Sequence, residues 1–247
     1  MHRFFIDSDN VHESQVVITG DDVKHIKNVL RLNVGDEIMV CDGESNDYLI
    51  EIEDIESDQV IGKIINKERS KGEPPIDVVL YQGLPKSTKM DLIIQKATEL
   101  GVKRIVPVIT ERTVVKIDNP KKENKKLERW NRIALEASKQ CKRGQIPNVE
   151  GVINFKDMVE EIKEDFVVVP YENEMKIGTK EILSKFNDKT ISIVIGPEGG
   201  FEEEEIEKLK EIGANIITLG PRILRTETAG FTTMAIVMYE IGDLGVI

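Results

Sequence analysis

Two glycine-bearing loops near the end of the chain hold the residues whose types and spacing best suit ligand binding. The first, residues 195–201, reads Ile-Gly-Pro-Glu-Gly-Gly-Phe and carries Glu198. The second, residues 219–229, reads Leu-Gly-Pro-Arg-Ile-Leu-Arg-Thr-Glu-Thr-Ala and carries Arg225. Glycine lets a ligand approach the backbone N–H and C=O groups closely. Either loop alone is as easily read as a strand-to-helix turn, but together they predict a ligand pocket.

An apolar, strand-like run precedes each loop, and a helix-like run follows it. Residues 191–195 lead into the first loop and residues 214–218 into the second. Parallel strands that alternate with helices end at a common edge of their sheet, where open α/β folds hold ligands. We therefore expect an α/β fold with both loops at the carboxyl edge of a parallel sheet.

The helix expected after the first loop begins with four consecutive glutamates, residues 202–205. These carboxylates would repel a phosphate placed at the N-terminus of that helix, so the run disfavours a pyrophosphate dinucleotide. Acidic residues at a helix start also simply complement the helix dipole, and this reading stays open. The ligand expected is neutral or cationic.

Charge is unevenly distributed along the 247 residues, whose formal net charge is −11. Residues 1–70 hold 7 Lys and Arg against 16 Asp and Glu, a net charge of −9. Residues 86–147 hold 16 against 7, a net charge of +9, and residues 148–247 hold 10 against 20, a net charge of −10. A polyanion such as a nucleic acid would have to approach the basic middle segment.

Several classes of protein are disfavoured by composition. No run approaches the roughly 18 apolar residues that a membrane span requires, and no basic, apolar leader opens the chain. Cys41 and Cys141 are isolated, and the three histidines have no metal-ligand spacing. We expect a globular cytoplasmic protein with no membrane segment, disulfide framework or metal.

The remaining elements suggest two domains. Short alternating runs up to residue 70 predict a small β-barrel, within which residues 21–31 have helical spacing of Val23, Ile26, Val29 and Leu30. A charged stretch ending in Pro74-Pro75 suggests the boundary, with domains at 1–70 and 71–247. Strands then alternate with helices to the end, and the last helix, 228–241, is apolar on several sides.

Two stripes follow the helix expected over residues 123–141. An apolar stripe of Leu127, Trp130, Ala134, Ala137 and Cys141 indicates that Trp130 packs in the core. The opposite stripe contains Arg129, Arg132, Glu136, Gln140 and Arg143. Such a stripe could bind phosphates, or it could be a solvated face with internal ion pairs.

The motifs taken in order resemble one family. They are Arg3-Phe4-Phe5, Glu99-Leu100-Gly101-Val102, Glu136-Ala137-x-x-Gln140-x-x-Arg143, the 196–201 loop and the 219–229 loop. In this order they resemble the RsmE-type 16S ribosomal RNA uracil-N3-methyltransferases, over essentially the whole chain. The resemblance implies an S-adenosylmethionine-dependent homodimer of the SPOUT superfamily that acts on 16S rRNA of the small ribosomal subunit. It also implies a PUA-like barrel at 1–70 and, at 71–247, a methyltransferase domain with a C-terminal trefoil knot.

The resemblance also assigns site residues by position. The cofactor is expected to contact Val169, Pro170, Ile195, Gly196, Gly199, Gly200, Leu219, Gly220, Ile223, Leu224 and Thr228. RNA contacts are expected from Arg3, Lys24, His25, Arg31, Lys86, Lys89, Arg132 and Arg143.

Methylation of uracil N3 requires loss of its proton, so the site needs a proton acceptor or a group that stabilises negative charge. Arg225 is expected to stabilise charge on the uracil oxygens, unless it pairs with Glu198 or Glu227. Glu198 is a candidate proton acceptor, although it could cap backbone groups while water accepts the proton. Two further alternatives remain: a related enzyme for another base or a ribose, and a non-catalytic RNA-binding protein of ribosome assembly.

Overall fold

Two compact units make up the computed structural model, which describes residues 2–115 and 119–245. The first unit contains Met1–Glu73 and Ser138–Ile146, and the second contains Pro74–Ala137 and Pro147–Ile247. The first break lies three residues beyond the predicted boundary of 70/71. The grouping of residues 138–146 with the first unit was not predicted, because nothing in their composition separates them from the preceding helix.

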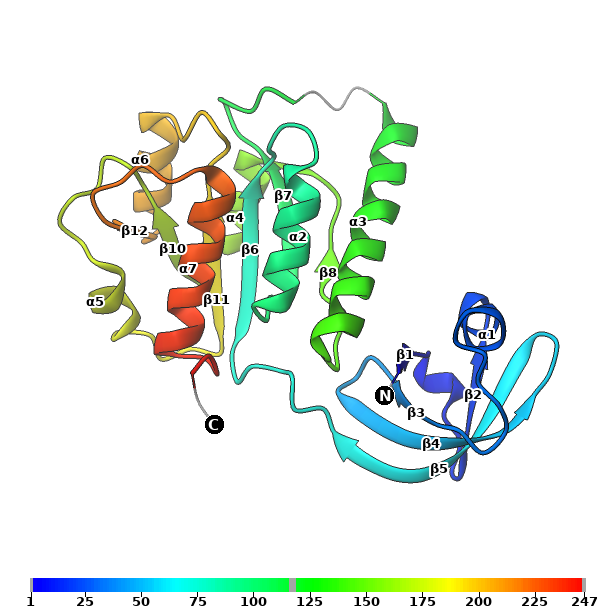
Figure 1. Ribbon diagram of the computed structural model, residues 1–247. Helices are drawn as coiled ribbons and strands as arrows, with labels where there is room; N and C mark the ends of the chain where they lie inside the picture. Colours follow the sequence, from blue (N-terminus) through cyan, green and yellow to red (C-terminus); the bar gives the residue numbers. More distant parts are fainter. Residues whose placement is uncertain (1, 116–118, 246–247) are drawn as a thin grey trace. The chain divides into compact units, whose positions relative to one another are not determined.

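The first unit is built on a five-stranded sheet with the strand order β1-β3-β4-β5-β2 (Figure 1). Its strands are β1 (Arg3–Phe5), β2 (Gln15–Thr19), β3 (Glu37–Cys41), β4 (Asn46–Ile55) and β5 (Gln59–Arg69). Alternate residues such as Ile38, Val40, Ile50 and Ile52 are fully buried, because successive side chains of a strand face opposite sides. Register shifts in the β4–β5 pair mark bulges, which bend long strands. The sheet forms a half-barrel around one apolar core.

The predicted helix at 21–31 is only partly α-helical. A 3₁₀ turn (η1, Ser8–Asn10) precedes β2, and α1 (Asp21–Lys24) continues directly into a π-helix (η2, His25–Leu30). Val23 and Ile26 are buried as predicted, but Val29 is 67% exposed. A π-helix has more residues per turn than an α-helix, so side chains after Ile26 rotate away from the expected face.

The second unit contains a seven-stranded parallel sheet with the order β12-β10-β11-β6-β7-β8, in which β9 also pairs with β7 (Figure 1). Its strands are β6 (Asp77–Gly83), β7 (Arg104–Ile109), β8 (Asn148–Val149), β9 (Ile153–Asn154), β10 (Phe166–Pro170), β11 (Thr190–Ile195) and β12 (Asn215–Ile217). Because β10 lies between β11 and β12, the loops that follow these three strands meet at one edge of the sheet.

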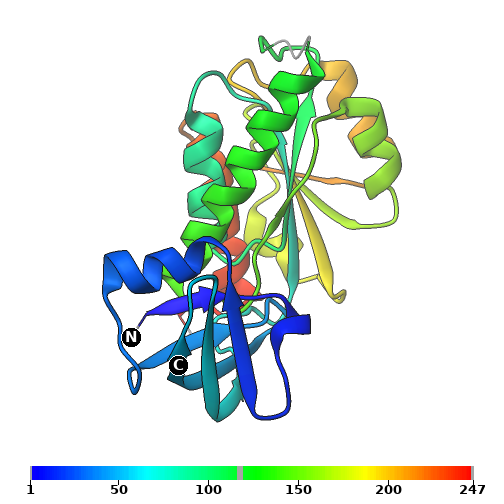
Figure 2. The ribbon, with the colours of Figure 1, turned by 90° about the vertical axis from the view of Figure 1, so that its right-hand side faces the viewer.

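Helices cover both faces of this sheet, as the edge-on view in Figure 2 shows. One face packs against α2 (Lys89–Glu99), α3 (Pro120–Cys141), α5 (Thr179–Leu183) and α7 (Thr226–Glu240), and the other against α4 (Phe155–Ile162) and α6 (Glu203–Glu211). Trp130 is 5% exposed and packs in the core of the first face, as its stripe predicted. Within the described residues, no helix is long and apolar enough to cross a membrane.

Arg3 and Arg143, both predicted to bind RNA, have largely enclosed side chains within the first unit. The Arg3 guanidinium donates to both carboxylate oxygens of Asp47, at 2.8 and 2.6 Å, and to the backbone oxygen of Arg143 at 2.8 Å. The Arg143 guanidinium donates to the Glu73 carboxylate at 2.7 Å, and Arg143 is 3% exposed. Guanidinium groups enclosed and paired in this way have few donors left for a phosphate, so the RNA contacts predicted for this pair find no support in these surroundings.

Replacing Arg3 tests this structural role. Arg3→Ala leaves the Asp47 carboxylate, whose side chain is only 10% exposed, without its cationic partner, so we expect a loss of about 3 kcal/mol in the stability of the first unit. Arg31→Ala is the matched control, since Arg31 is exposed, and should change stability by less than about 0.5 kcal/mol. Native-state amide exchange of β4 measures both values. Equal protection in the two variants would contradict the structural role.

Candidate active site

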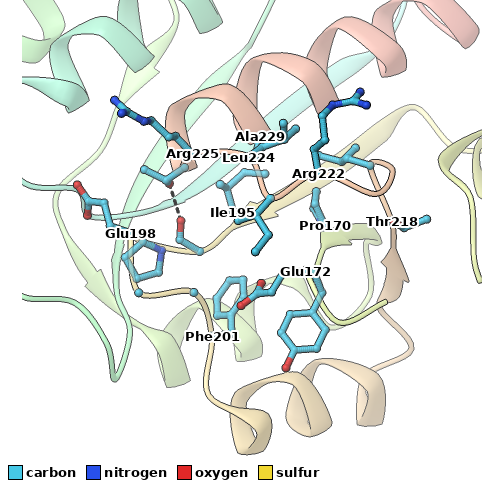
Figure 3. Close-up of a pocket in the computed structure, with 18 of the residues that line it drawn as sticks. Pro170, Glu172, Ile195, Glu198, Phe201, Thr218, Arg222, Leu224, Arg225 and Ala229 are labelled. Carbon is cyan, nitrogen blue, oxygen red and sulfur yellow. Dashed lines mark hydrogen bonds between the residues drawn. The ribbon is translucent and has the colours of Figure 1, made fainter. Parts of the chain in front are cut away.

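A cavity of about 690 Å³ opens at the carboxyl edge of the parallel sheet. Its walls come from the loops after β10, β11 and β12, with Lys89 of α2 and Ala229 of α7 (Figure 3). The two glycine loops thus lie on one pocket, as their sequence positions predicted. Ligand cavities of small molecules commonly have this size.

Nine of the eleven residues predicted to contact a cofactor line this cavity. They are Pro170, Ile195, Gly196, Gly199, Gly200, Leu219, Gly220, Ile223 and Leu224. Val169 does not, because its side chain is fully buried in the core beneath α4 and α6. Thr228 does not, because Thr226 and Ala229 occupy the cavity-facing side of α7 and the intervening Thr228 points to solvent.

A hydroxyl group joins the two glycine loops. Thr226, the first residue of α7, is 6% exposed, and its Oγ1 donates to the backbone oxygen of Gly196 at 2.6 Å (Figure 3). The same Oγ1 accepts a hydrogen bond from Nε2 of Gln82 at 2.9 Å. Gln82 lies in β6 and is fully buried. The start of α7 is therefore tied to both the sheet and the first loop.

Arg112 holds the first loop from outside the cavity. Its guanidinium donates to both oxygens of Glu202, at 2.7 and 2.9 Å, and to the backbone oxygen of Gly199 at 3.0 Å. Glu202 and Glu205 form a reciprocal capping box at the start of α6, so its N-terminal N–H groups are partly satisfied from within the protein. A ligand phosphate therefore finds both negative charge and occupied donors at this helix end.

Close packing of the backbone explains why residue 83, next to the 195–201 loop, is a glycine. A Cβ atom added to Gly83, the last residue of β6, would lie 2.4 Å from the backbone nitrogen of Pro197. A larger residue at position 83 would therefore displace the first loop.

Lys89 neutralises two carboxylates at the edge of the cavity. Its Nζ lies 3.2 Å from Glu198 and 3.3 Å from Glu227. Partial burial opposes the charged form of Glu198, but hydrogen bonds from the Lys86 backbone N–H and from Lys89 outweigh it and lower the pKa of Glu198. A lowered pKa makes Glu198 a weaker base, and the hydrogen bond that it accepts from the Lys86 backbone N–H is consistent with the capping alternative.

Arg225 is left exposed by this arrangement. The two carboxylates predicted as its possible partners, Glu198 and Glu227, both pair with Lys89 instead. Within residues 2–115 and 119–245, no hydrogen bond or ion pair engages the Arg225 guanidinium, which extends from the cavity rim on the Glu198 side (Figure 3).

Comparison with known proteins decides the family. A profile of the RNA methyltransferase domain matches residues 72–238, and one of the RNA methyltransferase PUA domain matches residues 18–65. The ribosomal RNA small subunit methyltransferase E of Bacillus subtilis is 38% identical over 97% of both chains. That of Mesomycoplasma hyopneumoniae is 33% identical over 93% of this chain and 95% of its own. This chain belongs to the ribosomal RNA small subunit methyltransferase E family.

A solved member of the family has the same fold. The ribosomal RNA small subunit methyltransferase E of Neisseria gonorrhoeae, bound to S-adenosylmethionine, superposes with a TM-score of 0.87, 29% identity and 99% coverage of both chains. The resemblance seen in the sequence motifs is thereby confirmed, as are the N-terminal PUA domain and the parallel α/β methyltransferase domain.

The site of this methyltransferase also includes residues that the sequence did not single out. Tyr171, Glu172 and Met175 line the cavity from the loop after β10. Their segment lacks a glycine motif that would indicate a binding loop. Only the strand order, in which β10 lies between β11 and β12, places this loop at the cavity. Phe201, Arg222, Thr226 and Ala229 belong to the recognised motifs and also line the cavity.

The remaining cations predicted to bind RNA lie in different surroundings. Lys24, His25 and Arg31 are exposed in the first unit, where Lys24 pairs with Asp21 at 3.1 Å. Lys86 and Arg132 are exposed in the second unit, whereas Lys89 belongs to the cavity. Among residues 2–115 and 119–245, no group of three or more His, Cys, Asp or Glu side chains is placed to hold a metal ion.

The shared hydroxyl of Thr226 makes a testable contribution to stability. Thr226→Val keeps the side-chain shape but removes the bonds to Gly196 and Gln82, so we expect a loss of about 2 kcal/mol. Thr228→Val, at an exposed position of the same helix turn, should cost less than about 0.5 kcal/mol. Urea unfolding followed by the fluorescence of buried Trp130 reports on this unit. Equal midpoints for the two variants would show that the hydroxyl does not join the loops.

Proposed function

We propose that this chain transfers the methyl group of S-adenosylmethionine to N3 of a specific uridine in 16S rRNA, acting on the small ribosomal subunit. The relatives are named for methylation of small-subunit ribosomal RNA, and the Neisseria gonorrhoeae structure holds S-adenosylmethionine. The observation that carries the proposal is the cavity, which both recognised glycine loops line.

The cavity fits this cofactor in size and chemistry. Backbone groups of Gly196, Gly199 and Gly200 are available on one wall, and apolar Ile195, Leu219 and Leu224 can enclose an adenine ring. The cofactor has no phosphate, which suits a loop whose following helix is capped by its own glutamates. When bound, S-adenosylmethionine supplies an electrophilic methyl group, whose bond to sulfur breaks as the bond to N3 forms.

The charged residues have distinct proposed roles. Arg225 stabilises the negative charge that spreads over the uracil oxygens as N3 loses its proton, because a guanidinium stays ionised and offers paired donors. Glu198, with its lowered pKa, anchors Lys89 and the first loop, and water accepts the N3 proton. Lys89 balances the negative charges of Glu198 and Glu227. We therefore assign it a structural role at the cavity rather than a contact with RNA phosphates.

RNA is proposed to contact exposed cations on each unit. In the first unit these are Lys24, His25 and Arg31, and in the second Lys86 and Arg132. Phosphate contacts of this kind position the RNA and do not read its sequence. Because its target belongs to the ribosome, we place the enzyme in the cytoplasm.

A knotted and dimeric C-terminal region completes the proposal. The final strand β12 pairs with β10 rather than with its sequence predecessor β11, and α7 follows it. This order supports the trefoil knot of SPOUT methyltransferases.

Apolar side chains remain exposed on α2 and α7, where Leu92 is 42% and Tyr239 is 67% exposed. These residues support a homodimer.

Nucleoside mass spectrometry tests the reaction. Small subunits from a strain that lacks this methyltransferase are incubated with the full-length protein and S-adenosylmethionine, and one 3-methyluridine per 16S rRNA is expected. In single-turnover reactions, Arg225→Ala should lower the rate by about 10²–10³-fold while cofactor affinity stays within about threefold. Arg222→Ala, on the same loop, is the matched control and should lower the rate less than about tenfold.

Two results would count against different parts of this account. Methylation at another atom of the RNA would overturn the proposed acceptor. A normal single-turnover rate in Arg225→Ala would remove Arg225 from the chemistry and leave the assigned reaction intact.

A further inference from the structure

One exposed carboxylate, Glu172, lines the cavity without joining the ion pairs around Lys89 and Arg112. Glu172 follows β10 by two residues and lines the cavity. Its Oε1 lies 2.6 Å from the point that a Cβ atom on Gly200 would occupy, so the carboxylate rests directly against the glycine loop. Figure 3 shows it on the side of the cavity where Phe201 lies. Gly200 therefore leaves room for this side chain as well as for a ligand.

Glu172 differs from the other carboxylate of the cavity in having no cationic partner. Glu198 is held by Lys89 at 3.2 Å. Arg112 lies within electrostatic range of Glu172, but its donors are used by Glu202 and by the backbone of Gly199. Over the part of the chain that the structure describes, no salt bridge or hydrogen bond engages the Glu172 side chain. The cavity thus presents an uncompensated negative charge beside its glycine wall.

The charges of the cofactor indicate what this carboxylate meets. S-adenosylmethionine carries a sulfonium, and its amino-acid end carries a carboxylate and an ammonium on one carbon. The ammonium is balanced by the carboxylate on the same carbon, so this end of the cofactor carries no net charge. The sulfonium, two methylene groups further along, is then the positive charge left for Glu172.

We infer that Glu172 is a specificity-determining residue that binds the sulfonium charge and so favours S-adenosylmethionine over the product S-adenosylhomocysteine. This inference rests on the proposed function, because it takes S-adenosylmethionine as the ligand. Methyl transfer turns the sulfonium into a neutral thioether, so the attraction to Glu172 ends with the reaction. The residue thereby strengthens cofactor binding without slowing the release of the product.

Calorimetric titration of the full-length protein tests the inference with three probes. They are S-adenosylmethionine, S-adenosylhomocysteine and sinefungin, which has a charged amine where the cofactor has its methylated sulfur. At low salt, Glu172→Gln should raise the Kd of S-adenosylmethionine and of sinefungin about tenfold, as expected for loss of one close charge pair near a protein surface. The Kd of S-adenosylhomocysteine should change less than about twofold.

Two further variants serve as controls. Glu204→Gln removes one exposed charge from α6 outside the cavity and should leave all three Kd values within about twofold. Glu172→Asp keeps the charge and should retain most of the discrimination. Thermal unfolding of each variant without ligand confirms that the fold is unchanged.

The possible failures of the inference and of the proposed function can be told apart. If the wild-type protein bound none of the three probes, the proposed function and the inference would both fall. If the wild type bound them and Glu172→Gln weakened the cofactor and its product equally, Glu172 would contact a group common to both, and the inference alone would be overturned. Unchanged Kd values for all three probes in Glu172→Gln would overturn it as well.

Discussion

The hydroxyl of Thr226 is the point on which the geometry of the active site depends. It accepts from Gln82 in the sheet and donates to Gly196 in the first loop, and it does so from the first residue of α7. Residues 196 and 226 are thirty positions apart, yet their loops must form opposite walls of one cavity. A hydrogen bond from a largely buried hydroxyl is suited to this task, because an unsatisfied polar group at the same place would be costly.

Charge compensation around this contact decides which groups remain available to a ligand. Lys89 forms ion pairs with Glu198 and Glu227, and Arg112 forms one with Glu202. Arg222 and Arg225 at the rim and Glu172 beside Gly200 remain available for contacts with a ligand. The site therefore has positive charge at its rim and a negative charge beside its glycine wall.

Sequence reasoning succeeded where local pattern and chain topology point the same way. The strand-loop-helix rhythm predicted the parallel sheet and the common edge of the two glycine loops, and the apolar stripe predicted a buried Trp130. The segment 1–70 was predicted as a barrel from alternation alone. The structure and the family profile place a half-barrel PUA domain there.

Other features of the structure have no signal in the local sequence pattern. The sequence around Arg3 gives no sign that its guanidinium is paired. Its partners, Asp47 and the backbone oxygen of Arg143, lie more than forty residues away along the chain. Val29 was misplaced because a π-helix has no distinct apolar spacing in the sequence. Glu172 was missed because only the strand order places the loop after β10 beside Gly200.

The central claim, that the two glycine loops act as one cofactor site, is tested most directly by hydrogen–deuterium exchange of the full-length protein with increasing S-adenosylmethionine. The account predicts that amides of residues 196–202 and 219–226 become protected together, with the same dependence on cofactor concentration, and that the first unit is unaffected. Protection confined to one loop, or located in the first unit, would contradict it.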